Sequence, residues 1–141
     1  MIRKQAVPEL NSYQLKRLPM TRVVSTIDAL NAADFDTALS FRVAPDEVYV
    51  QADIDALAIN DEHAIITKES SLSGTWLSMD VALHFLQHEC AWELPLERPA
   101  FVQGMVAHLP VKLYFEESRV LIMTAAPFAH NLQERLKEFA S

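Results

Sequence analysis

The sequence predicts an α+β fold, in which two or three helices pack on a mostly antiparallel sheet within a single domain. Three observations predict it. Short β-branched and apolar runs alternate with longer helical patterns. Several runs are joined by tight turns, and no regular βαβ repeat is present, so an antiparallel sheet is favoured. The chain has 141 residues, 50% of them hydrophobic and 22% charged, which is enough to bury a core in one domain.

The first expected elements are an N-terminal arm, a strand and a helix. Residues 1–17 are polar, so we expect an arm that precedes a folded domain over 18–141. The β-branched run RVVSTI at 22–27 predicts a strand. The alanine- and leucine-rich run at 28–39 predicts a helix with Asp28 as its N-cap.

The segment FRVAPDEVYV at 41–50 predicts a β-hairpin. Apolar residues alternate on both sides of its centre, where Pro45 and Asp46 favour a tight turn. The acidic stretch at 53–61 that follows predicts a loop.

A second strand pair is expected at 64–67 (AIIT) and 72–77 (LSGTWL). Both runs are short and apolar or β-branched, and few residues separate them, so we expect them to pair with each other. Gly74 lies inside the second run, where a glycine indicates a bulge or the close approach of another segment.

The central helix is predicted at 79–90, after Ser78 as the N-cap. Asp80 lies in its first turn, where a carboxylate is favoured by the helix dipole. Four residues at helical spacing predict its buried face: Met79, Leu83, Leu86 and Cys90.

Three strands and a helix are expected in the C-terminal part. The strands are predicted at 102–107, 111–115 and 120–125, and the nearly uniform apolar character of the last predicts a central strand. We expect the chain to break at Leu109-Pro110 between the first two. Pro127 begins the last helix, and its predicted buried face consists of Phe128, Leu132, Leu136 and Phe139.

Charge and composition exclude several classes of protein. The net charge is −7, from 12 basic and 19 acidic residues, so a nucleic-acid-binding face is not expected. The single cysteine permits no intrachain disulfide, and no apolar run is long enough for a signal peptide or a membrane span. We therefore expect a cytoplasmic protein that binds neither nucleic acid nor membrane.

The histidines are the first candidates for a reactive or metal-binding site. His84 and His88 have the i, i+4 spacing of two ligands on one helix. Phe85 occupies the position of the general base in a metalloprotease motif, and the sequence fixes no third ligand near the pair. Both histidines lie off the predicted buried face, so we expect surface histidines and no metal site.

The other reactive residue types also lack a catalytic pattern. Cys90 falls on the predicted apolar stripe beside Glu89, a setting that favours a small buried hydrophobe over a lowered thiol pKa. The two glycines, Gly74 and Gly104, are too far apart to build a phosphate-binding loop. We expect no catalytic residue on this chain.

Two aromatic residues are the candidates for a partner interface. Trp92 lies in the proline-bounded loop AWELPLERPAF, and Phe101 follows that loop. Exposed aromatic residues often anchor protein–protein interfaces, whereas the simpler interpretation of Trp92 and of Trp76 is core or edge packing.

Several short motifs resemble one protein family. The turn Leu77-Ser78-Met79-Asp80-Val81-Ala82 resembles the strand-to-helix turn of the gamma subunit of heterotetrameric sarcosine oxidase, with Ser78 and Met79 in place of glycine and proline. The hairpin FRVAPDEVYV is similar to a hairpin of the same subunits. Further matches are Gly104, Pro110-Val111, Leu113, Phe128-Ala129, Leu132 and Leu136. The resemblance covers residues 39–139 and extends to the aminomethyltransferase (glycine cleavage T-protein) superfamily.

The resemblance implies a non-catalytic accessory subunit of an oxidative demethylation complex. Flavin and tetrahydrofolate would then be bound by larger flavoprotein subunits of a hetero-oligomer, with no cofactor on this chain. Two alternatives remain. One is a stand-alone folate-binding protein of the aminomethyltransferase superfamily, which would hold the folate between domains or in a homodimer; the accessory subunit itself would form a homodimer when alone. The other is an unrelated protein-interaction domain.

Overall fold

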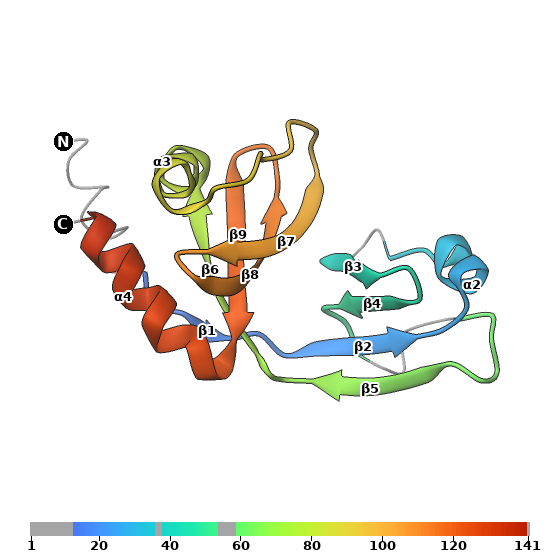
Figure 1. The fold of residues 1–141 in the computed structure, drawn as a ribbon. Coiled ribbons are helices and arrows are strands. Elements are labelled where there is room, and N and C mark those ends of the chain that lie inside the picture. The colour runs from blue at the N-terminus through green and yellow to red at the C-terminus, as the bar shows by residue number, and fades with distance from the viewer. Residues whose placement is uncertain (1–12, 36–37, 54–58, 141) are drawn as a thin grey trace. The chain divides into compact units, whose positions relative to one another are not determined.

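The computed structural model describes residues 13–35, 38–53 and 59–140. It confirms the α+β class, with two antiparallel sheets and α-helices (Figure 1). The described chain forms two compact units, one of residues 1–17 and 72–141 and the other of residues 18–71. We call them unit 1 and unit 2.

Unit 2 contains a four-stranded antiparallel sheet with the order β3-β4-β2-β5. Its strands are β2 (Met20–Val24), β3 (Ser40–Ala44), β4 (Glu47–Val50) and β5 (Ile65–Glu69). The predicted hairpin at 41–50 is confirmed as β3 and β4. The core of the unit consists of Val23, Leu30, Val48 and Val50.

The first helix is shorter than predicted and begins earlier. Helix α2 (Ile27–Ala32) has Thr26 as its N-cap, whose hydroxyl accepts a hydrogen bond from the backbone N–H of Ala29 at 3.1 Å. The prediction of Asp28 as the cap was therefore wrong. Asp28 lies in the first turn instead, and the backbone becomes extended at Ala33, which ends the helix.

The predicted pairing of 64–67 with 72–77 was wrong. Strand β5 pairs with β2, whereas β6 (Leu72–Ser78) belongs to unit 1 and pairs with β9 (Arg119–Ala125). The apolar strand β9 needs a neighbour on each side, and β6 supplies one of them. The ladder between β6 and β9 has no register shift at Gly74, so the bulge considered there is not formed.

Unit 1 contains a five-stranded antiparallel sheet with the order β1-β6-β9-β8-β7. The remaining strands are β1 (Lys16–Arg17), β7 (Ala100–Val106) and β8 (Leu109–Phe115). As predicted, β9 is central. The hairpin of β7 and β8 turns at Ala107 and His108, which have φ angles of 53° and 66°. Two left-handed residues match the right-handed strand twist, so the chain turns before the predicted break at Leu109-Pro110.

Helix α3 (Met79–Glu89) confirms the Ser78 cap, whose hydroxyl accepts from the N–H of Val81 at 3.4 Å. Its fully buried residues are Ala82, Phe85 and Leu86. The predicted stripe therefore had only one buried member, Leu86, and missed Phe85. The stripe's other residues, Met79, Leu83 and Cys90, are partly buried.

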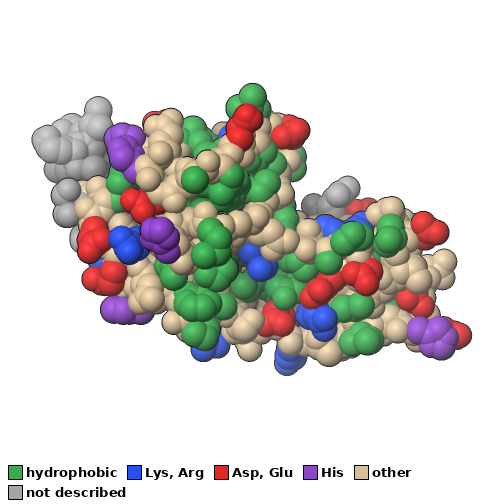
Figure 2. Space-filling model, in the orientation of Figure 1, with side chains coloured by type: hydrophobic (Ala, Val, Ile, Leu, Met, Phe, Trp, Pro, Cys, Tyr) green, Lys and Arg blue, Asp and Glu red, His purple; other side chains and the backbone are tan. Residues whose placement is uncertain are grey.

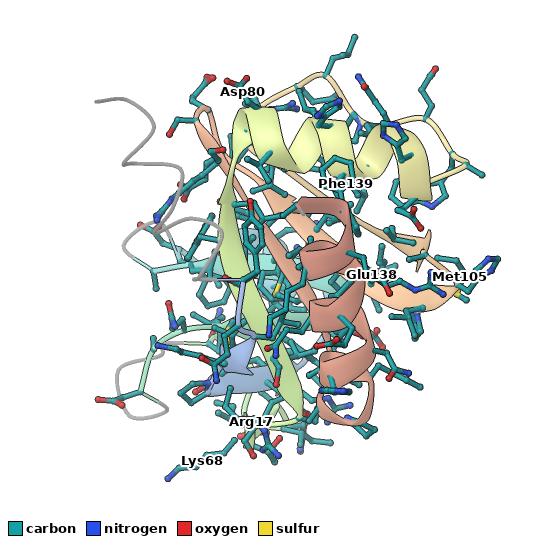
Figure 3. The ribbon with its side chains drawn as sticks, turned by 90° about the vertical axis from the view of Figure 1, so that its left-hand side faces the viewer. Arg17, Lys68, Asp80, Met105, Glu138 and Phe139 are labelled. Carbon is teal, nitrogen blue, oxygen red and sulfur yellow. The ribbon has the colours of Figure 1, made fainter. Side chains whose placement is uncertain are left out.

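The last helix is preceded by a 3-10 turn, η2 (Ala126–Phe128), that contains Pro127 and leads into α4 (Ala129–Ala140). Leu132 and Leu136 are buried as predicted, but Phe128 is 37% exposed because it belongs to the turn and not to the helix face. Helices α3 and α4 lie on the same face of the five-stranded sheet (Figures 1 and 3).

The described end of the expected N-terminal arm is folded. Tyr13 is 3% exposed and belongs to the core of unit 1. The backbone N–H of Leu15 donates to Oε1 of Gln133 at 2.8 Å, and β1 pairs with β6. Residues 1–12 of the arm lie outside the described residues. In the part of the chain that the structure describes, no helix has the length and apolarity needed to cross a membrane.

Candidate functional site

The loop between α3 and β7, residues 90–99, contains the predicted interface residue Trp92. The indole Nε1–H of Trp92 donates to the carbonyl oxygen of Met105 at 2.9 Å. Cys90, the C-cap of α3, places its Sγ 3.5 Å from the carbonyl oxygen of Trp92. The first part of the loop is thus attached both to α3 and to β7.

Gly104 allows this attachment. A Cβ atom placed on Gly104 would lie 2.9–3.0 Å from atoms of the Trp92 ring, closer than carbon atoms pack. The glycine in β7 is therefore required by the close approach of the indole. Gly104 was noted in the sequence, but the partner that makes it necessary lies 12 residues earlier and has no sequence signal.

Arg98 holds the second part of the loop. Its Nη1 donates to the carbonyl oxygens of Pro95 at 2.9 Å and Glu97 at 2.8 Å. Its guanidinium carbon lies 4.8 Å from the centroid of the Phe115 ring, which is fully buried. The cation therefore closes the loop on itself and packs on the core of unit 1.

The anchored loop presents an apolar side chain to solvent. Leu96 is 91% exposed and Met105, in the adjacent strand β7, is 55% exposed. Figure 2 shows hydrophobic and acidic side chains next to each other at the end of this loop, and Figure 3 shows Met105 projecting outward. Leu96 is the most exposed of the large hydrophobic side chains in the described part of the chain, which makes it the candidate for a contact with a partner.

The two residues predicted for the interface are less exposed than Leu96. Trp92 and Phe101 are both partly buried, and Trp92 contacts the strand to which Phe101 belongs. Sequence reasoning missed Leu96, because nothing in the segment Leu94-Pro95-Leu96 tells the exposed leucine from the one that packs on the core.

The histidine pair has a packing role. His84 and His88 are exposed, as predicted, and their rings lie 5.3 and 5.6 Å from the Phe139 ring of α4. Nδ1 of His88 donates to the carbonyl oxygen of His84 at 2.9 Å. Figure 3 shows Phe139 between α3 and α4, with Asp80 at the start of α3. Among the described residues, no three potential ligands are grouped to hold a metal ion.

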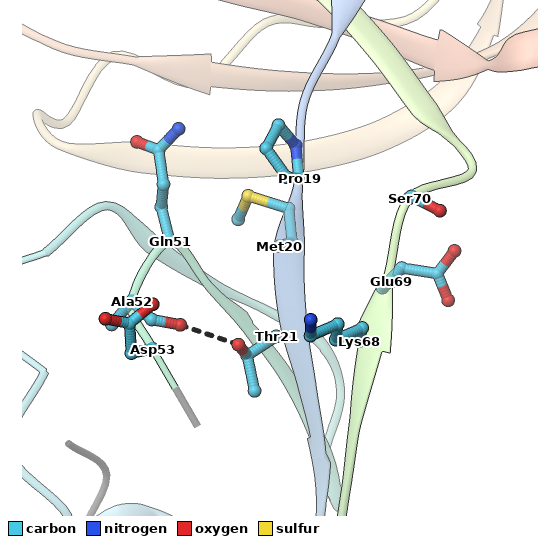
Figure 4. A pocket seen from close by; sticks show the side chains of 9 residues that line it. All are labelled: Pro19, Met20, Thr21, Gln51, Ala52, Asp53, Lys68, Glu69 and Ser70. Carbon is cyan, nitrogen blue, oxygen red and sulfur yellow. Dashed lines mark hydrogen bonds between the residues drawn. The ribbon is translucent and has the colours of Figure 1, made fainter. Parts of the chain in front are cut away.

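A separate hollow of about 540 Å³ lies in unit 2, at the end of β2 and β5 (Figure 4). Lys68 and Glu69 of β5 line one side, and the segment after β4, which contains Asp53, lines the other. Between them the buried hydroxyl of Thr21 donates to the carbonyl oxygen of Ala52 at 2.6 Å. Lys68 points toward Thr21, whereas Glu69 points the other way and its carboxylate accepts from the backbone N–H of Ser71 at 3.1 Å (Figure 4).

Comparison with known proteins shows the fold. No protein-family model matches the sequence, and no curated protein matches it either. Among solved structures, the chain is similar to a chain of heterotetrameric sarcosine oxidase from Corynebacterium sp. U-96, determined in complex with pyrrole 2-carboxylate. The TM-score is 0.66 at 19% sequence identity, and the match covers 90% of this chain and 85% of the other. The protein therefore has the fold of a subunit of heterotetrameric sarcosine oxidase.

Proposed function

We propose that this protein is a non-catalytic accessory subunit of a sarcosine-oxidase-like complex that carries out oxidative demethylation. The observation that carries the proposal is the fold match, which covers 90% of this chain and 85% of a chain from a heterotetrameric enzyme. Because the match extends over nearly the whole of both chains, it favours this protein being the equivalent of that subunit over the two proteins sharing only one common fragment. The role of the subunit is to bind larger flavoprotein subunits through an exposed apolar surface.

In this proposal the flavin and tetrahydrofolate belong to the partner subunits. Three of the reactive side chains that the structure describes are engaged in packing, which supports that assignment. The rings of His84 and His88 pack on Phe139, and the thiol of Cys90 faces the carbonyl oxygen of Trp92.

Affinity purification from the native cells tests the proposal. The tagged chain should retain larger subunits in fixed stoichiometry, and the eluate should be yellow with the absorbance bands of a flavin. A tag expressed alone serves as the control. A colourless eluate that contains this chain alone, as a monomer or a homodimer, contradicts the proposal.

The hollow in unit 2 favours a second candidate function, the binding of a folate by this chain itself. Its volume of about 540 Å³ is in the range of small-molecule sites. The ammonium of Lys68 complements the carboxylates of a folate, and the carboxylate of Asp53 complements the N–H groups of its pterin ring.

A thermal-shift titration with folinic acid tests this second candidate. Ligand at a hundredfold excess over its dissociation constant should stabilise the protein by about 2.7 kcal/mol. The stabilisation should fall in Lys68→Ala and Asp53→Asn, and it should persist in Lys137→Ala, which removes an exposed lysine from α4 in unit 1. An unchanged melting temperature over the whole titration rules out the folate site.

A further inference from the structure

We propose that residues 93–97, here called the Leu96 tip, insert Leu96 into an apolar socket with a rim of lysine or arginine on a partner protein. The inference rests on the proposed function in taking that partner to be a larger subunit of the complex. It adds the element that docks and the chemistry of the surface that receives it.

The side chain of Leu96 is available for insertion. It is 91% exposed, the highest value among the exposed large hydrophobic residues of the described chain. The neighbouring Leu94 packs against the core of unit 1, so the loop buries one leucine and presents the other. Removing an exposed leucine from water in a partner's socket yields a favourable free energy that this chain does not gain alone.

The loop holds the Leu96 tip in a defined position. On one side Trp92 donates to the carbonyl oxygen of Met105 at 2.9 Å. On the other side Arg98 donates to the carbonyl oxygen of Pro95 and packs on Phe115. A loop already ordered before binding loses less conformational entropy in the complex, which strengthens association.

The charge of the Leu96 tip defines the rim of the socket. Glu93 and Glu97 are both exposed and flank Leu96. Arg98 is the only basic residue of 90–99, and its guanidinium is directed into the loop and onto Phe115. The tip therefore presents a leucine between two carboxylates, and complementary lysine or arginine side chains would steer and orient the partner.

The negative charge of Glu93 and Glu97 disfavours several kinds of partner. Anionic lipid headgroups and nucleic-acid phosphates repel two exposed carboxylates. A twofold-symmetric contact centred on the Leu96 tip would bring two acidic tips together, since each copy contributes the same patch. These observations favour a different protein as the partner, one whose surface has an apolar pocket surrounded by basic residues.

Site-specific photo-crosslinking in the native cells tests the inference. The reactive group is introduced as Leu96→p-benzoylphenylalanine, and the matched control is Phe128→p-benzoylphenylalanine, at a 37%-exposed aromatic position of the same unit. The position-96 variant should crosslink at least tenfold more efficiently than the control. Its target should be an apolar peptide of the partner with lysine or arginine close to the crosslinked residue.

Affinity measurements with the crosslinked partner complete the test. Leu96→Asp should weaken binding at least tenfold, and Phe128→Asp should change it less than twofold. The double variant Glu93→Gln/Glu97→Gln should reduce the association rate and its dependence on salt, because it removes the steering charges.

Each outcome separates this inference from the proposed function. A flavoprotein target with the expected peptide supports both, and a target of the same chemistry without flavin supports the Leu96 tip while contradicting the proposed function. Crosslinking no stronger than the control, or only to a second copy of this chain, overturns the inference. If the eluate in that case still contains flavoprotein, the proposed function stands.

Discussion

The indole of Trp92 lies directly on the backbone of Gly104. Its ring atoms are 2.9–3.0 Å from the position that a Cβ on Gly104 would occupy, and its Nε1–H donates to the carbonyl oxygen of the next residue, Met105, at 2.9 Å. This contact fastens the loop that carries Leu96 to strand β7. A backbone position that has no side chain thus determines where an exposed loop is held.

Gly104→Ala should therefore displace Trp92 and destabilise the protein. The added methyl group would be too close to an aromatic ring that is itself hydrogen-bonded, so we expect a loss of about 1–3 kcal/mol in the free energy of unfolding. Urea denaturation measures the loss, and the tryptophan emission spectrum reports the displaced indole.

A double-mutant cycle provides the control. In a Trp92→Ala background the ring is gone, so Gly104→Ala should be neutral or slightly stabilising, because alanine restricts the unfolded chain more than glycine does. An equal loss of stability in both backgrounds would mean that the ring of Trp92 is not the cause.

The elements that follow from local sequence signals were predicted well. Ser78 caps α3, Pro45 and Asp46 form the hairpin turn, and the apolar run at 120–125 is the central strand β9. Each depends on residues that are neighbours in the chain, where propensity and capping act directly.

Contacts between distant segments could not be predicted in the same way. The partner of β6 is β9, more than 40 residues later, and not the adjacent strand β5. Several pairings were compatible with the alternation of β6, and tertiary packing selected one. In the candidate site, Trp92 was found from its residue type, whereas the exposure of Leu96 depends on how Arg98 folds the loop.

Two apolar residues of the last helical segment should respond differently to truncation. Leu132→Ala should destabilise the protein by about 2–5 kcal/mol, since Leu132 is fully buried against the sheet of unit 1. Phe128→Ala should cost much less, because Phe128 is 37% exposed. Chemical denaturation of both variants measures the difference. Equal losses would restore the sequence prediction that both residues share one buried face.

Ser78→Ala should weaken the start of helix α3. The Ser78 hydroxyl accepts from the N–H of Val81 at 3.4 Å, and alanine leaves that donor without its cap. We expect a loss of about 1 kcal/mol in the free energy of unfolding, with Ser78→Asp close to wild type. Ser118→Ala, at an exposed serine in a nearby turn, should change stability very little. Similar losses in both alanine variants would argue against a capping role.

Ser25→Ala should raise the pKa of Asp61. In the native protein, the Ser25 hydroxyl donates to Oδ2 of Asp61 at 2.5 Å and the N–H of His63 donates to Oδ1 at 2.9 Å. These hydrogen bonds favour the carboxylate and hold the pKa of Asp61 below its ordinary value, with the Ser25 hydroxyl as the main cause. NMR titration of the side-chain carboxyl carbon should show the pKa moving up towards that of an ordinary aspartate.

The same shift makes stability depend on pH in a defined direction. Because the pKa of Asp61 is lower in the folded than in the unfolded state, its contribution is complete above the unfolded value of about 3.9 and is lost as the pH falls through the folded value. In Ser25→Ala, stability should therefore decline less steeply with acid in that window. Asp61→Asn is the matched control, since it removes the titrating group and this part of the pH dependence altogether. If Ser25→Ala leaves the titration of Asp61 unchanged, the hydroxyl does not hold the carboxylate, and the hydrogen bond from His63 becomes the next candidate.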